Sequence, residues 1–380
     1  MNNLKTYKLK LIGDFTNVSN VSNSYLQAIN YMSEIIYNKH KDIPIKDIKP
    51  DNPNKLSKQY YAIIRDKFKL TSQLTQSLFR HLMGTYWSMK SNGNWELAVY
   101  KKPTIPICWK RDFNVSNRNG LTIWKNKFTY QSRKIPEGKW KDSKLKLIKG
   151  QWYLILTMEL KSSELKTEGN VIGVDRGIKN ILVATNLSTN KTLYIKGGKL
   201  NHKRRCIRQT RSKVASVGTR SAKRLLKRLS GKEKSVTQEM LHLASKKLVT
   251  FAQSQNAKTI VMEKLTHYRK KQKSQGKTLN RMKHSWPYAQ TGFYIEYKSL
   301  DKGMEVQYVN PKDTSRGCPK CGNVSKENRN GLEFCCVSCG YKDNSDRNGS
   351  INISMRSVLL RQAKEERASI NRLIVAESNL

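Results

Sequence analysis

Five of the seven cysteines in the chain are confined to the 22 residues from Cys318 to Cys339. Four of them form two Cys-x-x-Cys pairs that are separated by 14 residues, and a glycine follows each pair: Cys318, Cys321, Cys336 and Cys339. Each such turn presents two thiolates to one ion, and two turns complete a closed tetrahedral site, so the spacing predicts one structural zinc ion. Cys335 lacks the matching spacing and is a spare thiol. A free-standing zinc ribbon is the plainest interpretation of the pattern taken alone.

The charge of the chain is strongly positive. Its 380 residues include 73 Lys and Arg but only 28 Asp and Glu, which gives a net charge of +45. Such a surface suits a polyanion, and the mixture of basic residues with Tyr and Trp favours nucleic acid over an anionic membrane or an acidic protein. The sequence contains no apolar run of about 18 residues and no secretion signal at its start. We therefore expect a cytoplasmic protein without a membrane partner, associated with the nucleoid in a prokaryote.

The first half of the chain combines helical and β patterns. Tyr7, Leu9 and Leu11 alternate with Lys8 and Lys10, which predicts a half-buried strand. The predicted elements are a strand over 5–12, helices over 24–38 and near 57–68 and 71–90, a proline-containing connector over 43–56, and β-rich segments over 96–160. We interpret this half as a small β-barrel that the N-terminal strand completes, with the helices inserted between its strands.

The second half has a different pattern. The stretch "NVIGVDRGIKNILVATN" predicts two apolar strands around a turn that contains Gly177, and "KTLYIKG" predicts a third. Two more strands, over 259–265 and 304–310, each follow a helical stretch. A meander followed by alternating helices and strands indicates an α/β layer of the RNase H-like type.

Three of the rare acidic residues stand at the ends of predicted elements. Asp175 interrupts the apolar strand "VIGVD", Glu263 ends the strand "TIVME", and Asp346 opens the predicted helix "DRNGSINISMR" just behind the cysteines. Taken singly, each is more often a helix cap or a partner of a lysine. Together they fit a site in which carboxylates hold two magnesium ions that act on a phosphodiester.

At these residues the chain resembles the TnpB family of transposon-encoded RNA-guided DNA endonucleases, which are relatives of the compact type V CRISPR effectors. The matching stretches are "GVDRGIKN", "GTRSAKRLLKRLSGKEK", "TIVMEKL", "LNRMKHSWPYAQTGFYIEYK", "TSRGCPKCG", "CVSCG" and "DRNGSINI", in the order of the family. The resemblance implies that Asp175, Glu263 and Asp346 are the catalytic, magnesium-binding residues of a RuvC-like nuclease. The sequence departs from the family after the last aspartate, where Gly349 and Ser350 replace two alanines.

The resemblance also implies a domain layout. An oligonucleotide-binding-type barrel, the wedge domain, takes residues 1–15 and 95–165, and a helical recognition domain takes residues 16–94. The RuvC-like nuclease takes residues 166–312 and 342–380. The zinc ribbon over 313–341 is a target-nucleic-acid-binding insertion that immediately precedes the last catalytic motif.

Basic residues concentrate in one segment behind the predicted meander. Residues 199–234 contain 14 Lys or Arg and a single Glu, a density that favours phosphate contact over a merely solvated face. The candidate nucleic-acid contacts are Arg204, Arg205, Arg220, Lys223, Arg224, Lys227, Arg228 and, just before the first cysteine pair, Arg316. A further basic segment over 266–290 is interpreted as a mobile loop that leads into an aromatic anchor at Trp286 and Tyr288.

The function implied is an RNA-guided, magnesium-dependent DNA endonuclease, with two catalytic magnesium ions and one structural zinc ion. Its expected partners are a structured guide RNA and a double-stranded target DNA with a short flanking motif, and a monomer is favoured. The alternatives are an RNA-guided repressor that binds without cutting and a transposase with a related carboxylate triad.

Overall fold

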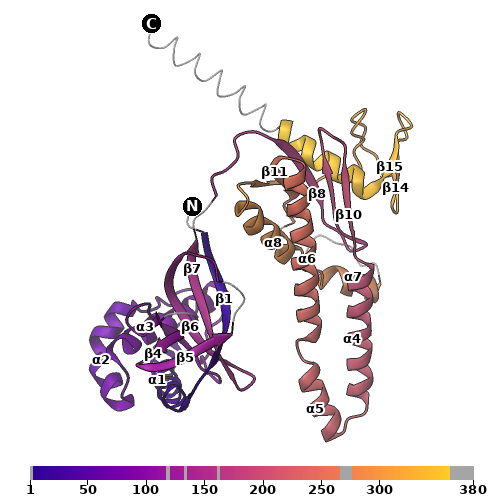
Figure 1. Cartoon of the computed structure of the whole chain (residues 1–380). Coiled ribbons are helices and arrows are strands. Elements are labelled where there is room, and N and C mark those ends of the chain that lie inside the picture. Colours follow the sequence, from indigo (N-terminus) through magenta and orange to yellow (C-terminus); the bar gives the residue numbers. More distant parts are fainter. Residues whose placement is uncertain (1–2, 117–119, 132–134, 161–162, 266–275, 360–380) are drawn as a thin grey trace. The chain divides into compact units, whose positions relative to one another are not determined.

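The computed structural model describes residues 3–116, 120–131, 135–160, 163–265 and 276–359. These residues fall into two compact units, with the division between Lys161 and Ser162 (Figure 1). Each unit has its own hydrophobic core, and each is described separately.

The first unit is a seven-stranded antiparallel sheet, curled into a nearly closed barrel, with three helices. Its strands are β1 (Asn3–Ile12), β2 (Thr104–Ile107), β3 (Phe113–Ser116), β4 (Gly120–Ile123), β5 (Asn126–Gln131), β6 (Lys139–Ile148) and β7 (Gln151–Leu160). The strand order is β2-β6-β7-β1-β5-β4-β3, so β1 lies in the middle of the sheet, between β7 and β5. Leu9 and Leu11 are buried while Lys8 and Lys10 are exposed, which confirms the predicted alternation.

The helices of the first unit are α1 (Thr16–His40), α2 (Pro53–Phe68) and α3 (Ser72–Ser91), between β1 and β2 in the chain. Helix α1 begins earlier than the predicted residue 24, because burial of Val18 outweighs the poor helix propensity of its first two turns. The predicted connector over 43–56 is too long. Asn52 accepts a hydrogen bond from the Asn54 amide and Pro53 occupies the first helical position, so the last proline of the segment starts α2.

The second unit contains a five-stranded mixed sheet of order β10-β9-β8-β11-β12. Its strands are β8 (Asn170–Asp175), β9 (Asn180–Asn186), β10 (Thr192–Lys196), β11 (Ala257–Glu263) and β12 (Glu305–Val309). Strands β8, β9 and β10 form an antiparallel meander, and β11 runs parallel to both β8 and β12. The α/β layer expected from the sequence is therefore present.

The helices of this unit are α4 (Gly198–Ser216), α5 (Arg220–Leu229), α6 (Lys232–Ser254), α7 (Lys277–His284) and α8 (Tyr288–Leu300), and a further helix spans 345–359. Helices α4 and α6 lie side by side as a long hairpin that extends away from the sheet, with α5 at its tip (Figure 1).

The segment expected to be a loop over 266–290 contains helix α7 and the start of α8. Arg281, Lys283 and His284 lie in the last turn of α7, where positive charge stabilises a helix. Residues 266–275 of this segment lie outside the described part of the chain. Trp286, one of the two predicted anchors, is buried in the core of the unit.

Strand β8 and the helix over 345–359 make a close contact that explains one glycine. A Cβ atom on Gly173 would lie 1.9 Å from the carbonyl oxygen of Ser350, so no larger residue fits between the two backbones. This contact brings the start of the last helix to the end of β8.

A three-stranded sheet of β13 (Arg329–Asn330), β14 (Glu333–Cys335) and β15 (Lys342–Asn344) immediately precedes the last helix. Among the described residues, no helix has the length and apolar character needed to cross a membrane.

Candidate functional site

The first two predicted carboxylates lie at the same edge of the sheet. Strands β8 and β11 are parallel neighbours, and Val174 is aligned with Met262. Asp175 and Glu263 are the next residues in each strand, so both side chains stand where these strands end. The α/β fold therefore brings together two acids that are far apart in the sequence.

The third carboxylate reaches the same place from the last helix. The Asn344 side chain caps this helix by accepting hydrogen bonds from the amides of Asp346 and Arg347. Asp346 is 8% exposed, and its carboxylate accepts a hydrogen bond of 2.8 Å from the Asn180 side chain. Its other oxygen lies 3.4 Å from the guanidinium of Arg329, a residue of β13.

Glu263 is held from two sides. Its carboxylate accepts a hydrogen bond from the hydroxyl of Thr314, which is 2% exposed. Its backbone carbonyl accepts a hydrogen bond from the buried guanidinium of Arg176, which also bonds to the carbonyl of Tyr288. Gly292 of α8 leaves the room for this guanidinium, because a Cβ atom there would lie 2.7 Å from it. Arg176 thus fixes the end of β11 against α8.

All three carboxylates line one pocket of about 340 Å³. Burial, followed by the charges of Glu263 and Asp346, raises the pKa of Asp175 to about 8. Burial also raises the pKa of Glu263, although the bond from Thr314 opposes this. The acids therefore repel one another in a site that water solvates poorly, and a cation would relieve that repulsion.

The basic and polar lining of the pocket was not predicted from the sequence. Lys179, Lys283 and Arg329 contribute cations to it, and Thr314 and Asn180 orient the acids. Arg329 gives no signal in the sequence, because it is one of many basic residues and its place depends on the fold of the cysteine-containing segment. Thr314 is the first residue of the "TSRGCPKCG" stretch, but nothing in the sequence links it to Glu263.

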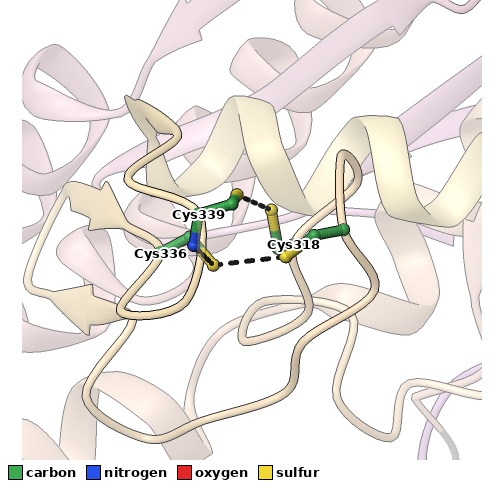
Figure 2. Close-up of side chains that lie close together, drawn as sticks. Cys318, Cys336 and Cys339 are labelled. Atoms are coloured by element: carbon green, nitrogen blue, oxygen red, sulfur yellow. Dashed lines mark hydrogen bonds between the residues drawn. The ribbon is translucent and has the colours of Figure 1, made fainter.

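The four predicted cysteines converge on one point. Their sulfur atoms all lie within 4.8 Å of one another, with 3.6 Å between Cys318 and Cys339 and 3.5 Å between Cys321 and Cys336. Figure 2 shows the labelled sulfurs turned toward the same space. A tetrahedral zinc ion with Zn–S bonds of about 2.3 Å would set its sulfurs about 3.8 Å apart, close to these distances. The residues therefore fit a zinc ion held by four sulfurs.

Hydrogen bonds connect the cysteine cluster to the rest of the unit. The side chains of Asn348 and Asn352, in the last helix, both bond to the carbonyl of Gly317, next to Cys318. Asn328 bonds to the carbonyl of Arg316 and to the amide of Val337, and so joins the two cysteine-bearing segments. The cluster is thus fixed directly to the helix that carries Asp346.

Seven of the eight predicted basic contacts are exposed: Arg205, Arg220, Lys223, Arg224, Lys227, Arg228 and Arg316. Arg204 differs, since it is 6% exposed and its guanidinium bonds to Glu233 and to the backbone and hydroxyl of Ser285. It also lies over the ring of Trp286. The side chain of Arg204 therefore holds α4 against α6 and the segment after α7. It does not belong to the exposed cations.

Comparison with known proteins agrees with this geometry. A family model described as "Cas12f1-like, TNB domain" matches residues 288–353, which include the four cysteines and Asp346. The CRISPR-associated endodeoxyribonuclease Cas12f1 of an uncultured archaeon is 25% identical over 234 residues, covering 57% of this chain and 44% of that protein. The TnpB-like protein MJ0751 of Methanocaldococcus jannaschii is 35% identical over 136 residues, covering 36% of this chain and 48% of that protein.

The fold has a solved counterpart in the structure of a Cas12f1–sgRNA–target DNA complex. The TM-score is 0.60 at 18% identity, with 88% of this chain and 80% of that one covered. The chain spans about half the length of the curated relatives that it matches. These matches confirm the resemblance stated from the motifs: the chain is similar to the TnpB-like proteins and the Cas12f-type compact type V effectors.

Proposed function

We propose that the protein is an RNA-guided, magnesium-dependent DNA endonuclease with one RuvC-like active site. The observation that carries this proposal is the convergence of Asp175, Glu263 and Asp346, from two strand ends and a helix start, in one pocket of a strongly basic chain. The relatives include proteins named as endodeoxyribonucleases, and the counterpart of known structure is bound to guide RNA and target DNA.

The donor set of the pocket suits magnesium. Magnesium prefers oxygen ligands and is bound by few carboxylates, because it keeps several of its waters. Asp175, Glu263 and Asp346 line one pocket of about 340 Å³, which has room for ions together with their waters. Such a donor set suits two ions about 3.5–4 Å apart, which when bound would activate water and stabilise the leaving oxygen.

The chain's own side chains prepare the pocket for a phosphodiester. Thr314 orients Glu263, while Asn180 and Arg329 hold Asp346. Lys179 and Lys283 add positive charge to the rim, which attracts the backbone of a DNA strand. One active site of this kind would cut single strands presented to it in turn and leave 5′-phosphates.

The exposed cations of α4 and α5 are proposed to contact the guide–target duplex. The set consists of Arg205, Arg220, Lys223, Arg224, Lys227 and Arg228. These residues lie on the helical hairpin that extends from the sheet (Figure 1), where a duplex can reach them without obstruction from the sheet. Base pairing with the guide would then read the sequence, while the protein reads shape and phosphates.

The test begins with the RNA that accompanies the protein. The chain is purified from cells that carry its native flanking DNA, the bound RNA is sequenced, and a plasmid library that matches this RNA is offered with magnesium. A discrete RNA together with cleavage beside one short motif is the expected result. A discrete RNA with binding but no cleavage would replace the nuclease by a repressor, and strand transfer of donor ends without RNA would replace it by a transposase.

A further inference from the structure

Arg176 is a buried arginine beside the carboxylates that the proposed function leaves without a role. It follows Asp175 directly at the end of β8, lines the carboxylate pocket and is 6% exposed. Buried charges in proteins are ordinarily paired with an opposite charge. The hydrogen bonds of this guanidinium instead go to two backbone carbonyls, and its Nε atom is buried without a partner among the described residues. Such a costly placement calls for a use of its own.

The backbone pairing of β8 with β11 stops one residue before the two strand-end acids. Its last aligned pair is Val174 and Met262. Beyond that pair, the Nη2 atom of Arg176 donates a hydrogen bond to the carbonyl oxygen of Glu263. The residue that follows Asp175 is thus bonded to Glu263 itself, and this bond continues the connection between the two strands at the level of their carboxylates.

The same guanidinium connects both strands to α8. Its Nη1 atom donates a hydrogen bond of 3.1 Å to the carbonyl oxygen of Tyr288, the first residue of α8. A Cβ atom on the buried Gly292 would lie 2.7 Å from Nη1 and 3.3 Å from the hydroxyl oxygen of Tyr308. Glycine is a poor helix former, so its presence inside α8 indicates that the space for this guanidinium outweighs the stability of the helix.

The charge of Arg176 also acts on the acids. Burial raises the pKa of Glu263, and the hydrogen bond from Thr314 and then the charge of Arg176 oppose this. Loss of Arg176 would therefore have two opposite effects on a metal ion in the pocket. It would release Glu263 from its fixed place, and it would remove a positive charge that repels the ion. A variant that keeps the charge but alters the hydrogen bonds separates the two effects.

We propose that Arg176 is a positioning residue for magnesium binding. Its guanidinium fixes Glu263 relative to Asp175 and to α8, and this fixed geometry lets the two carboxylates share metal ions. Gly292 keeps open the space in which the guanidinium lies. The inference rests on the proposed function in taking magnesium as the ion, and it adds to that function a residue outside the set of metal ligands.

The test uses two variants of the full chain, purified with zinc bound. R176K keeps the positive charge, but the single nitrogen of lysine does not reproduce the planar fork with which arginine reaches both carbonyls. G292A keeps Arg176 and its charge, and places a methyl group where the guanidinium lies. The two variants therefore disturb the same contact from opposite sides.

Each variant has a matched control. R204Q removes another arginine that is 6% exposed, whose partners Glu233 and Ser285 do not line the carboxylate pocket. G84A adds a methyl group to an exposed glycine of α3, where a Cβ atom meets nothing within 4 Å. The controls show what loss of a buried arginine and a glycine-to-alanine change in a helix do by themselves.

Manganese(II) serves as the probe, because the electron paramagnetic resonance signal of the free ion reports binding without any cleavage. Asp175→Asn gives the level of binding outside the pocket. Cleavage of guided DNA is measured in parallel across a range of magnesium concentrations, and urea midpoints report the stability of each protein.

R176K should bind manganese about 10–100-fold more weakly than the wild type, the loss typical of a group that orients a metal ligand. G292A should lose affinity in the same direction. In both variants the magnesium concentration for half-maximal cleavage should rise, and high magnesium should restore part of the rate. R204Q and G84A should keep the wild-type metal affinity, whatever their urea midpoints.

Wild-type manganese affinity in R176K, or a loss that R204Q shows equally, would overturn the proposal. If R176K does not fold, G292A decides by the same criterion against G84A. If R176K loses affinity and G292A does not, only the role of Gly292 falls. Failure of the proposed function gives a different result: equal manganese binding by the wild type and Asp175→Asn would remove the magnesium site itself, and Arg176 with it.

Discussion

The cysteine cluster and the carboxylate pocket both collect side chains that can bind metal ions, but they do so in opposite ways. The cluster draws four sulfurs from one short segment into a closed tetrahedron, with distances of 3.5 and 3.6 Å across two of its edges. The pocket, of about 340 Å³, is lined by Asp175, Glu263 and Asp346, which come from three elements far apart in the sequence. A closed site leaves no coordination position for a substrate, whereas an open one does.

The two sites also differ in what they fix. Hydrogen bonds to Gly317 connect the cluster to the last helix. The neighbouring sheet of β13, β14 and β15 places the guanidinium of Arg329 next to the carboxylate of Asp346. We therefore expect the cluster to support the pocket without taking part in its chemistry. Substitutions in each site test this difference between a supporting cluster and an open pocket.

The largest effect is expected from Asp175→Asn, which removes one carboxylate from the open site. Because the lost interaction is worth several kcal/mol in the transition state, cleavage of guided DNA should fall by at least about a thousandfold. Binding of guide RNA and target should be unchanged, since the exposed cations proposed to contact them are not altered. Cleavage and binding are measured in parallel, with the exposed Glu327→Gln as the matched control. Cutting at the wild-type rate by Asp175→Asn would remove the pocket from the mechanism.

The next prediction compares substitutions of two adjacent cysteines, Cys336 and Cys335. Cys336→Ser should lose the bound zinc, because a structural site of this kind gains much of its folding free energy from the metal. Cleavage should fall with it, as Arg329 and the start of the last helix lose their support. Cys335→Ser, at an exposed thiol one position away, should keep both zinc and activity. Zinc content by elemental analysis and the cleavage rate are the measurements, and a Cys336→Ser protein that keeps its zinc would contradict the assignment of ligands.

A smaller effect is expected at a residue that donates a hydrogen bond to one of the carboxylates and is not itself expected to bind the metal. Thr314→Val removes the hydroxyl that donates to Glu263 while keeping the shape of the side chain. Loss of such a bond to a metal ligand typically costs about 10–100-fold in activity or metal affinity. Thr314→Ser, which keeps the hydroxyl, should restore most of the rate, and higher magnesium should partly rescue Thr314→Val. A rate that is the same for Val, Ser and Thr at every magnesium concentration would show that the bond has no role.

The two sites differ equally in how far the sequence could predict them. The cysteines could be placed because their spacing alone encodes the geometry, and the structure brings all four together. The three carboxylates could be proposed from strand ends and a helix start, since parallel strands end at one edge. Arg329 and Thr314 could not, because their positions depend on how separate segments pack.

The fold shows the same limit. Alternation in β1 and the apolar runs of β8 and β11 indicated the barrel and the α/β layer. Two helix assignments depended on local features of the sequence: capping for the start of α2 at Pro53, and charge at the helix end for α7. The three prolines of the first segment and the basic composition of the second predicted a connector and a loop instead. In the sequence Arg204 resembles its basic neighbours. Only the fold shows that its guanidinium donates hydrogen bonds to Glu233 and Ser285.

Glu233 is a partly buried acid whose pKa can be compared with those of the pocket carboxylates. Its substitution is expected to have the smallest effect, which is on stability. Burial alone would raise the pKa of Glu233, but hydrogen bonds and charges from Arg208 and Arg204 outweigh it and lower the pKa. Two arginines therefore lower the pKa of this acid, whereas burial and the two neighbouring acids raise the pKa of Asp175. Because the folded pKa is lowered, the stabilisation is complete above the ordinary value of 4.5 and is lost as the pH falls through the folded pKa.

Glu233→Gln should therefore destabilise the protein at neutral pH by about 1–3 kcal/mol, since it leaves the buried Arg204 without its charged partner. The difference from wild type should shrink as the pH falls from 4.5 through the lowered pKa of the folded protein, where first the unfolded and then the folded carboxylate becomes protonated. Urea unfolding midpoints at a series of pH values check both points, with Glu327→Gln as the exposed control. A difference that stays constant down to the lowest pH would mean that Glu233 contributes through packing, and the contrast between Glu233 and the pocket would then rest on the raised pKa of Asp175 alone.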